Sequence, residues 1–206
     1  MPETIKQRRR DATVEVIVEA AESAMTHNGF DSVTMRDIAV QAGCAPATLY
    51  QYFTNKQELL DAIVEQHSAE VLRLMRSAMA TTDDPVEKLR LRIQCAGEYR
   101  NQNRAVIRLI HTSAPHAPGD PASRLPPSAR AEWEAFWQEE VKLVKAGQQQ
   151  GRIRQDFDAE VIQRYMRRVA HTLFEEFSAQ DPQISQEEQL RIVWGLLAGG
   201  MGIWDE

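Results

Sequence analysis

The 206-residue sequence predicts an all-α protein of about nine helices. Apolar residues recur at spacings of three and four along most of the chain, and no stretch shows the alternation that is typical of a strand. Residues suited to helix starts precede several of these stretches. Residues 33–56 place a tight glycine turn between two short helical segments, which is the layout of a helix-turn-helix.

Residues 1–10 are expected to form a disordered arm that carries the basic cluster Lys6–Arg10. The cluster is either a solubilising tail or an arm that lies along phosphates or reaches into a minor groove. A helix follows from about Asp11 to Asn28, where apolar residues recur at helical spacing, and Gly29 ends it.

The segment 33–56 carries the signals of two short helices and the turn between them. Thr34 suits the N-cap of the first helix, and Asp37, three residues later, completes a capping box. Gly43 lies where the chain reverses and needs a positive φ, which glycine adopts at low cost. Pro46 suits the first turn of the second helix, and Leu49 points back to the core.

Cap and breaker signals place the remaining helices. Asn55 with Glu58 begins a long helix near Lys56, and Asp84-Pro85 begins the next one. Segment 114–127 holds five of the nine prolines and is predicted to be a loop, a lid or a mobile border. The other predicted helices span about 104–113, 128–150, 158–179 and 185–204.

The last predicted helix is apolar on both sides. One side repeats at spacings of four and three like a coiled-coil seam, and the other carries Ile192, Leu196 and several glycines. Such a helix must be buried on both faces, which is hard to arrange in a monomer of this size. We therefore expect a homodimer with a four-helix interface built from the last two helices of each chain. The predicted interface residues are Phe177, Leu190, Trp194, Leu197, Met201 and Trp204.

Composition limits the possible classes of protein. The net charge of −6 argues against a generally basic nucleic-acid coat, so DNA contact must be local and depend on a dimer. No apolar run is long enough to span a membrane and the N-terminus lacks an apolar signal core, so a cytoplasmic location is expected. Cys44 and Cys95 form no C-x-x-C motif and are interpreted as buried or free thiols.

Signals of catalysis are weak. The sequence has no G-x-S-x-G, P-loop or G-x-G-x-x-G motif, and its histidines lack the i, i+4 spacing of a metal site on one helix face. His111 and His116 flank Pro115 and could share a metal, but we expect no metal and no cofactor. His67 lies on an apolar stripe and is interpreted as a core or boundary histidine. The protein is therefore predicted not to be an enzyme.

The string from Thr34 to Leu59 resembles the DNA-binding domain of the TetR family of bacterial transcription regulators. The resemblance covers about residues 11–60, and beyond it only the size and the helical layout are similar. It implies a DNA-binding domain at 1–55 and a ligand-binding and dimerisation domain at 56–206. The matching residues are Thr34, Ile38-Ala39, Ala42-Gly43, Thr48-Leu49-Tyr50, Tyr52-Phe53 and Lys56 to Leu59.

By this resemblance, the recognition helix spans about Ala45 to Phe53. Arg36 is expected to pair with a guanine and Gln51 with an adenine edge. The residues expected at the major groove are Arg36, Ala45, Pro46, Ala47, Thr48 and Gln51. Those expected to hold phosphates are Thr34, Tyr50, Tyr52 and Lys56. Tyr50 could instead be a core aromatic, and Thr34 could be a cap alone or serve in both roles.

Three positions depart from the family pattern. Ala45 stands where serine or threonine is common, which removes a hydroxyl that could both cap the helix and contact DNA. Ala47 stands where glycine is common, so the DNA contacts at both alanines are in question. Cys44 replaces the usual valine and is interpreted as a packing residue rather than a redox switch.

Interior aromatic and polar residues between 85 and 178 suggest a ligand site. Each could be core packing, but together, beside the proline-rich loop, they suit an apolar pocket with a few hydrogen-bonding groups. The predicted lining is Cys95, Tyr99, His111, Trp133, Trp137, Tyr165, His171 and Phe174. In proteins that look like this, an inducer in such a pocket tilts the long helix that begins near Lys56 and lowers the affinity for DNA.

The sequence therefore predicts a homodimeric, ligand-responsive DNA-binding regulator, a repressor released by a small apolar or aromatic inducer. Its expected partners are double-stranded operator DNA and that inducer, with no membrane. One alternative is a regulator whose pocket is vestigial or which signals through a protein partner. From another class, the alternative is a helical small-molecule-binding or enzymatic protein that retains the fold without DNA function, which the acidic balance favours.

Overall fold

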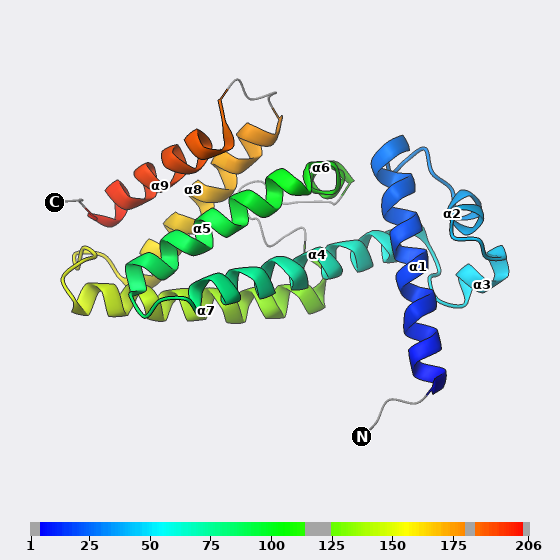
Figure 1. Cartoon of the computed structure of the whole chain (residues 1–206), viewed down its shortest axis with the longest axis horizontal. Coiled ribbons are helices and arrows are strands. Elements are labelled where there is room, and N and C mark those ends of the chain that lie inside the picture. The colour runs from blue at the N-terminus through cyan, green and yellow to red at the C-terminus, as the bar shows by residue number, and fades with distance from the viewer. Residues whose placement is uncertain (1–4, 114–124, 180–183, 204–206) are drawn as a thin grey trace. The chain divides into compact units, whose positions relative to one another are not determined.

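The computed structural model describes residues 5–113, 125–179 and 184–203. Within these ranges the chain forms nine helices and no strand, as predicted (Figure 1). No helix in this part of the chain is long and apolar enough to cross a membrane. The helices are α1 (Ile5–Asn28), α2 (Met35–Gln41), α3 (Pro46–Tyr50), α4 (Lys56–Met79), α5 (Pro85–Gln102), α6 (Arg104–Ser113), α7 (Pro127–Gln149), α8 (Ala159–Ala179) and α9 (Gln186–Met201).

The helices group into two compact units. The N-terminal unit contains the residues up to Gln66 together with 105–114, and the C-terminal unit contains His67–Arg104 and the residues from 115 onward. Helix α4 begins in the first unit and ends in the second. The division of function predicted between residues 55 and 56 falls at the start of α4 and remains a prediction.

The core of the N-terminal unit is formed by α1, α2, α3 and the first turns of α4. Ile17, Ile38, Leu49 and Leu60 are among its buried side chains. Helix α6 also contributes to this core through Val106 and Leu109. The predicted ligand-binding domain, 56–206, includes α6. An apolar stripe does not show which partner a helix packs against, so the place of α6 in this core does not follow from its sequence.

Helix α1 begins earlier than expected. The prediction of a disordered arm is wrong for residues 5–10, which form the first turns of α1. Lysine, glutamine and arginine are good helix formers, and the Gln7 side chain donates a hydrogen bond to Asp11 one turn later (3.0 Å). The remaining arm residues, 1–4, lie outside the described residues.

The C-terminal unit consists of the end of α4 with α5, α7, α8 and α9. Its larger core cluster joins α5, α7, α8 and α9, and a second cluster packs α4 against α7 through Leu72, Met75 and Phe136. Asp84 caps α5 by accepting hydrogen bonds from Val86 N (2.9 Å) and Glu87 N (3.4 Å). The predicted start of α5 is therefore confirmed.

Two further boundaries bear on the sequence predictions. Helix α7 begins at Pro127, and the predicted loop 114–127, with His116, lies outside the described residues up to residue 124. Helix α9 ends at Met201 rather than near Trp204. Gly202 adopts φ 69° at its C-cap, the left-handed conformation that commonly ends helices.

Candidate functional sites

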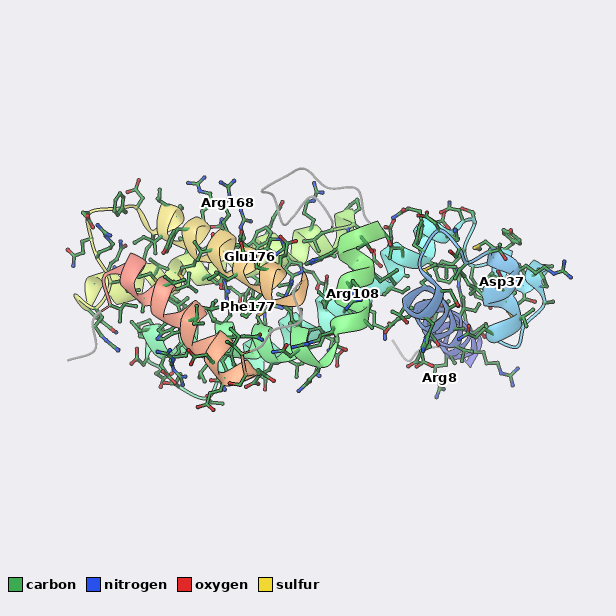
Figure 2. The ribbon with its side chains drawn as sticks, turned by 90° about the horizontal axis from the view of Figure 1, so that it is seen from above. Arg8, Asp37, Arg108, Arg168, Glu176 and Phe177 are labelled. Atoms are coloured by element: carbon green, nitrogen blue, oxygen red, sulfur yellow. The ribbon has the colours of Figure 1, made fainter. Side chains whose placement is uncertain are left out.

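A capping box fixes the start of the helix-turn-helix. The Thr34 hydroxyl accepts a hydrogen bond from Asp37 N (3.2 Å), and Asp37 Oδ2 accepts from Thr34 N (2.9 Å) and from the Thr34 hydroxyl (2.6 Å). These bonds to Thr34 hold the pKa of the Asp37 carboxyl below its ordinary value. Asp37 lies on the outside of α2 (Figure 2). The cap predicted from the sequence is confirmed.

The turn between α2 and α3 has the predicted glycine geometry. Gly43 adopts φ 66°, and an added Cβ would meet no atom within 4 Å, so the backbone conformation rather than space requires glycine. Pro46 is the first residue of α3. Ala45 occupies its N-cap and makes no side-chain capping bond, which confirms that the missing hydroxyl leaves this helix uncapped.

The short helix α3 exposes one side and anchors the other. Leu49 is fully buried, so the orientation of α3 on the core is fixed. Tyr50 is 53% exposed, which rules out the alternative of a core aromatic. Helix α3 ends at Tyr50, and Gln51 is its C-cap, so the recognition helix is shorter than predicted. The predicted DNA-facing residues that are exposed are Thr34, Arg36, Ala45, Pro46, Ala47, Tyr50 and Gln51, while Thr48 and Tyr52 are half-buried.

Arg10 of α1 lies beside the end of the recognition segment. Its guanidinium carbon is 5.9 Å from the centre of the Tyr52 ring, a cation–π distance. Arg10 is exposed and Tyr52 is half-buried, so the pair presents a positive charge next to a phenol hydroxyl. The sequence shows a basic cluster here but gives no sign of this pairing.

Lys56 has a structural role that the sequence analysis missed. Its amine donates hydrogen bonds to the carbonyl oxygens of Phe30 (2.7 Å) and Asp31 (3.3 Å), and it lies 4.8 Å from the centre of the Phe30 ring. The amine is thus engaged within its own unit, which differs from the phosphate contact predicted for it. Lys56 ties the segment after α1 to the start of α4.

Comparison with known proteins agrees with this geometry. Residues 17–63, which contain α2, α3 and the turn between them, match the model of the bacterial regulatory proteins of the tetR family. Residues 17–63 belong to the TetR family. The sequence-based resemblance is therefore confirmed.

Several named regulators are similar to this chain. An uncharacterised HTH-type transcriptional regulator of Mycobacterium tuberculosis, MT1294, is 30% identical over 120 residues, and the match spans 58% of this chain and 59% of that protein. The fatty acid degradation regulator FadR of Bacillus halodurans aligns with a TM-score of 0.73 at 19% identity, covering 90% of this chain and 98% of that one. FadR of Thermus thermophilus, a TetR family repressor solved with lauroyl-CoA, aligns with a TM-score of 0.62 at 24% identity, covering 94% and 97%.

These likenesses establish the fold for nearly the whole chain and the family for its N-terminal part. The named relatives are regulators of transcription, which agrees with the prediction that this protein is not an enzyme.

The residues predicted to line a ligand pocket are divided between the two units. His111 belongs to the N-terminal unit, whereas the others belong to the C-terminal unit. Tyr165 is exposed, and its hydroxyl donates to the carbonyl oxygen of Leu196 (3.0 Å), so it lies on the α9 side of α8. His171 pairs with Glu175 one turn along α8 (3.2 Å).

Several other predicted pocket residues share the interior of the C-terminal unit. Cys95, Trp133 and Trp137 pack against the cluster of α4 and Phe136. Phe174 is buried in the larger core cluster. Tyr99 is buried, and its hydroxyl donates a hydrogen bond to Glu70 Oε2 (3.0 Å). The same hydroxyl oxygen lies 2.6 Å from His67 Nδ1. His67 is only 8% exposed, as expected of a hydrogen-bonded core histidine.

The predicted dimer seam of α9 needs correction. Leu197 and Met201 are 0% exposed within their own chain, so they have no surface to offer a second chain. Phe177, Leu190 and Trp194 are half-buried, and Trp204 lies outside the described residues.

The outward side of α9 instead carries Leu196, which is 52% exposed. Gly195 and Gly199 lie on the same helix, and a Cβ added at either would meet no atom within 4 Å. A three- and four-residue repeat identifies an apolar side but not what covers it.

A buried charged group in the C-terminal unit escaped the sequence analysis. Glu140 of α7 is 0% exposed and pairs with Arg92 Nε of α5, and its other oxygen accepts from Gln163 Nε2 of α8 (3.0 Å). The three residues therefore connect three helices. No local signal reveals them, because their partners lie far apart in the sequence.

Proposed function

We propose that this protein is a homodimeric DNA-binding regulator of transcription, a repressor that a small apolar or aromatic inducer releases from its operator. The observation that carries the proposal is the helix-turn-helix. Its first helix is fixed by the Thr34–Asp37 cap and its second by buried Leu49, while α3 keeps its other side exposed. A helix held in this way suits the major groove of DNA. Such a protein acts in the cytoplasm.

The exposed residues divide into two roles in this proposal. Arg36 pairs with a guanine and Gln51 with an adenine, while Ala45, Pro46, Ala47 and Thr48 pack at the major groove. Thr34, Tyr50 and Tyr52 hold phosphates and fix the register on DNA. Arg10 joins this group because its charge lies against the Tyr52 ring. Lys56 is a positioning residue that holds the segment after α1 rather than a phosphate contact.

Dimerisation is proposed through the outer side of α8 and α9. Val161, Tyr165 and Leu196 are exposed apolar or aromatic residues on these helices, and Gly195 and Gly199 leave space for close approach. Helices of a second copy packed on this side would form the expected four-helix interface. A dimer presents two recognition helices to half-sites about one turn of DNA apart, roughly 34–36 Å.

The inducer site is proposed in the C-terminal unit, around Cys95, Trp133 and Trp137. Helix α4 runs from the N-terminal unit into this cluster, so a ligand there can act on the DNA-binding unit through one continuous helix. The ligand needs only to prefer the state that does not bind DNA. FadR of Thermus thermophilus, a TetR family repressor that shares the fold, was solved in complex with lauroyl-CoA, which supports a small-molecule ligand for this chain.

The DNA roles are tested by operator selection followed by gel shift with two variants. Gln51→Ala should change the preference at one base pair, because a base contact carries sequence information. Tyr52→Ala should weaken binding to all sequences by a similar factor. A uniform loss for Gln51→Ala would contradict its assigned role.

The second candidate is a helical small-molecule-binding or enzymatic protein that keeps this fold without DNA function. The net charge of −6 favours it, because DNA binding gains from positive charge. The absence of selective binding to any duplex by the wild-type protein would support this candidate. Selective DNA binding that no ligand alters would instead indicate a vestigial pocket or a protein partner.

A further inference from the structure

A groove with a volume of about 250 Å³ lies between α5 and α9, two helices that pack against each other in the C-terminal unit (Figure 1). Each helix contributes residues spaced three or four apart, which share one face of a helix. This lining differs from the cluster around Trp133 and Trp137, where the inducer site is proposed. The residues that line the α5–α9 groove include Arg90, Ile93, Glu187, Leu190, Arg191 and Trp194.

The floor of the groove is apolar. Ile93 is buried in the core of the unit, and Leu190 and Trp194 are half-buried and pack against the same core. Gly97, one turn after Ile93, lets Leu190 lie close to α5, because a Cβ added there would come within 2.5 Å of Leu190 Cδ2. A hydrocarbon or aromatic group that covered these side chains would leave water, which is favourable.

The two arginines of the groove are already held by carboxylates. Arg90 donates to both carboxylate oxygens of Glu87, from Nε (2.7 Å) and Nη2 (2.6 Å). Arg191 donates in the same way to Glu188, from Nε (2.7 Å) and Nη2 (2.5 Å). These hydrogen bonds hold the pKa of both carboxyls below the ordinary value. An anionic ligand would have to displace two bidentate carboxylates, so the arginines do not favour one.

Glu187 supplies a carboxylate that is not engaged in this way. It is exposed in the first turn of α9, and it makes no hydrogen bond or ion pair within the part of the chain that the structure describes. Since Arg90 and Arg191 are each balanced by their own glutamate, the charge that remains in the groove is that of Glu187. The groove is therefore complementary to a cation.

The spacing along α9 sets the length of a ligand that would use both the charge and the apolar floor. Glu187 and Trp194 line the same groove seven positions apart, which is about 10 Å at 1.5 Å per residue. An ammonium on a chain of about eight carbons has this length, given carbon–carbon bonds of about 1.5 Å. The lysine of a protein partner is too short to join the two residues, because its stem has only four carbons.

We propose that the α5–α9 groove binds a small organic cation, an alkyl or aryl-alkyl ammonium compound whose charge pairs with Glu187 and whose apolar chain lies against Leu190 and Trp194. The inference goes beyond the proposed function, because both the residues and the ligand chemistry differ from those of the inducer site. A ligand bound in this way contacts α5 and α9 together and stabilises the C-terminal unit.

The test is a titration of the full chain with four small probes, followed by calorimetry. Octylamine is protonated at neutral pH and carries the cation and the chain, octanol carries the chain alone, octanoate reverses the charge, and butylamine shortens the chain. Octylamine should bind roughly fivefold more tightly than octanol, the gain of an exposed ion pair, and more tightly still than octanoate. It should bind at least tenfold more tightly than butylamine, because four more methylene groups leave water.

Nuclear magnetic resonance locates the probe. The indole N–H signal of Trp194 is assigned by its absence in Trp194→Phe, and those of Trp133 and Trp137 in the same way. Octylamine should shift the signal of Trp194, which lines the groove, and leave those of the other two unchanged. A shift at Trp133 instead would place the amine in the inducer cluster and overturn the inference.

Matched variants test the charge. Glu187→Gln should weaken octylamine binding roughly fivefold and leave octanol unchanged, because it removes one exposed ion pair. The control is Glu176→Gln, at an exposed glutamate of α8 (Figure 2), which should change neither. Glu187→Lys should reverse the preference, so that octanoate binds more tightly than octylamine. Both positions are exposed, so the variants should fold as the wild type does.

Three further results would overturn the inference. They are octanol or octanoate binding as tightly as octylamine, equal effects of Glu187→Gln and Glu176→Gln, and no binding of octylamine. A Trp194 signal that moves with protein concentration in the absence of any probe would show that a second copy of the chain occupies the groove, which would also overturn it. None of these readouts uses DNA, so the result is independent of whether the protein regulates transcription.

Discussion

The two units of this protein hold their polar groups in different ways. In the N-terminal unit, the helix caps join near neighbours at the surface, such as Thr34 with Asp37 and Thr54 with Glu58. In the C-terminal unit, buried polar groups join distant parts of the chain. Arg92 of α5 pairs with Glu140 of α7, 48 residues later, and His67 of α4 contacts Tyr99 of α5, 32 residues later.

The contrast shows where each unit is sensitive. A surface cap contributes modestly and can be replaced by water, so single changes in the N-terminal unit should alter DNA affinity more than folding. A buried charge cannot be left without its partner, so single changes at Glu140 should alter folding of the C-terminal unit.

Glu140→Gln should destabilise the protein by about 3–5 kcal/mol, because it leaves the buried Arg92 guanidinium without a counter-charge. The matched control is Glu139→Gln at the adjacent residue, which forms an ion pair with Arg76. The Glu139 side chain is 45% exposed and that of Arg76 is 42% exposed, so this pair should contribute about 0–1 kcal/mol to stability. Urea unfolding of both variants measures the difference. Equal midpoints for the two would contradict the assignment of Glu140 as a buried structural anchor.

Arg10→Ala should weaken DNA binding and reduce the slope of log affinity against log salt by about 1, as expected for the loss of one phosphate contact. The effect should be the same for all DNA sequences, because the pair with Tyr52 faces the backbone in the proposed complex. Arg8→Ala removes the same charge from an exposed position in the first turns of α1 (Figure 2). A slope that falls equally in both variants would show that the ring contact has no special role.

Asp37→Asn should lower the stability of the N-terminal unit near neutral pH and have little effect in acid. The folded-state pKa of Asp37 lies below its ordinary value of 3.8, so its stabilising effect is present above that value and is lost as the pH falls through the folded pKa. Thermal unfolding of wild type and variant across this range provides the measurement. A difference that persisted unchanged in strong acid would show that the carboxylate charge is not its source.

Ala45→Ser should give the smallest effect, a stabilisation of about 0.5–1 kcal/mol, because it supplies the N-cap oxygen that α3 lacks. Ala47→Ser, inside the same helix, is the control and should not stabilise. Chemical unfolding followed by far-UV circular dichroism measures both. If Ala45→Ser did not increase the stability, the backbone N–H groups of the first turn of α3 would already be satisfied by water.

Sequence reasoning succeeded where the determinant is local. The Thr34–Asp37 cap, the left-handed Gly43, Pro46 at the start of α3 and the Asp84 cap each depend on residues within one turn, and each is present. The family could be identified from the same stretch. The nine helices of the described ranges follow from apolar spacing.

It failed where the determinant is a distant partner. Residues 5–10 look like a polar tail but continue α1, and the amine of Lys56 is engaged by the carbonyls of Phe30 and Asp31. Leu197 and Met201 are buried in the core of their own unit because of the helices that α9 packs against. The apolar pattern of α9 does not specify those helices. The Glu140 network was invisible for the same reason.

The most direct test of the account is selection of duplexes from a random pool by the full-length wild-type protein, followed by gel shifts of the selected site at low and high salt. We expect enrichment of a two-fold symmetric site whose half-sites are about one helical turn apart, with affinity that falls steeply as salt rises. Recovery of no preferred sequence, or of binding that salt does not weaken, would contradict the central claim that the helix-turn-helix of this chain reads DNA.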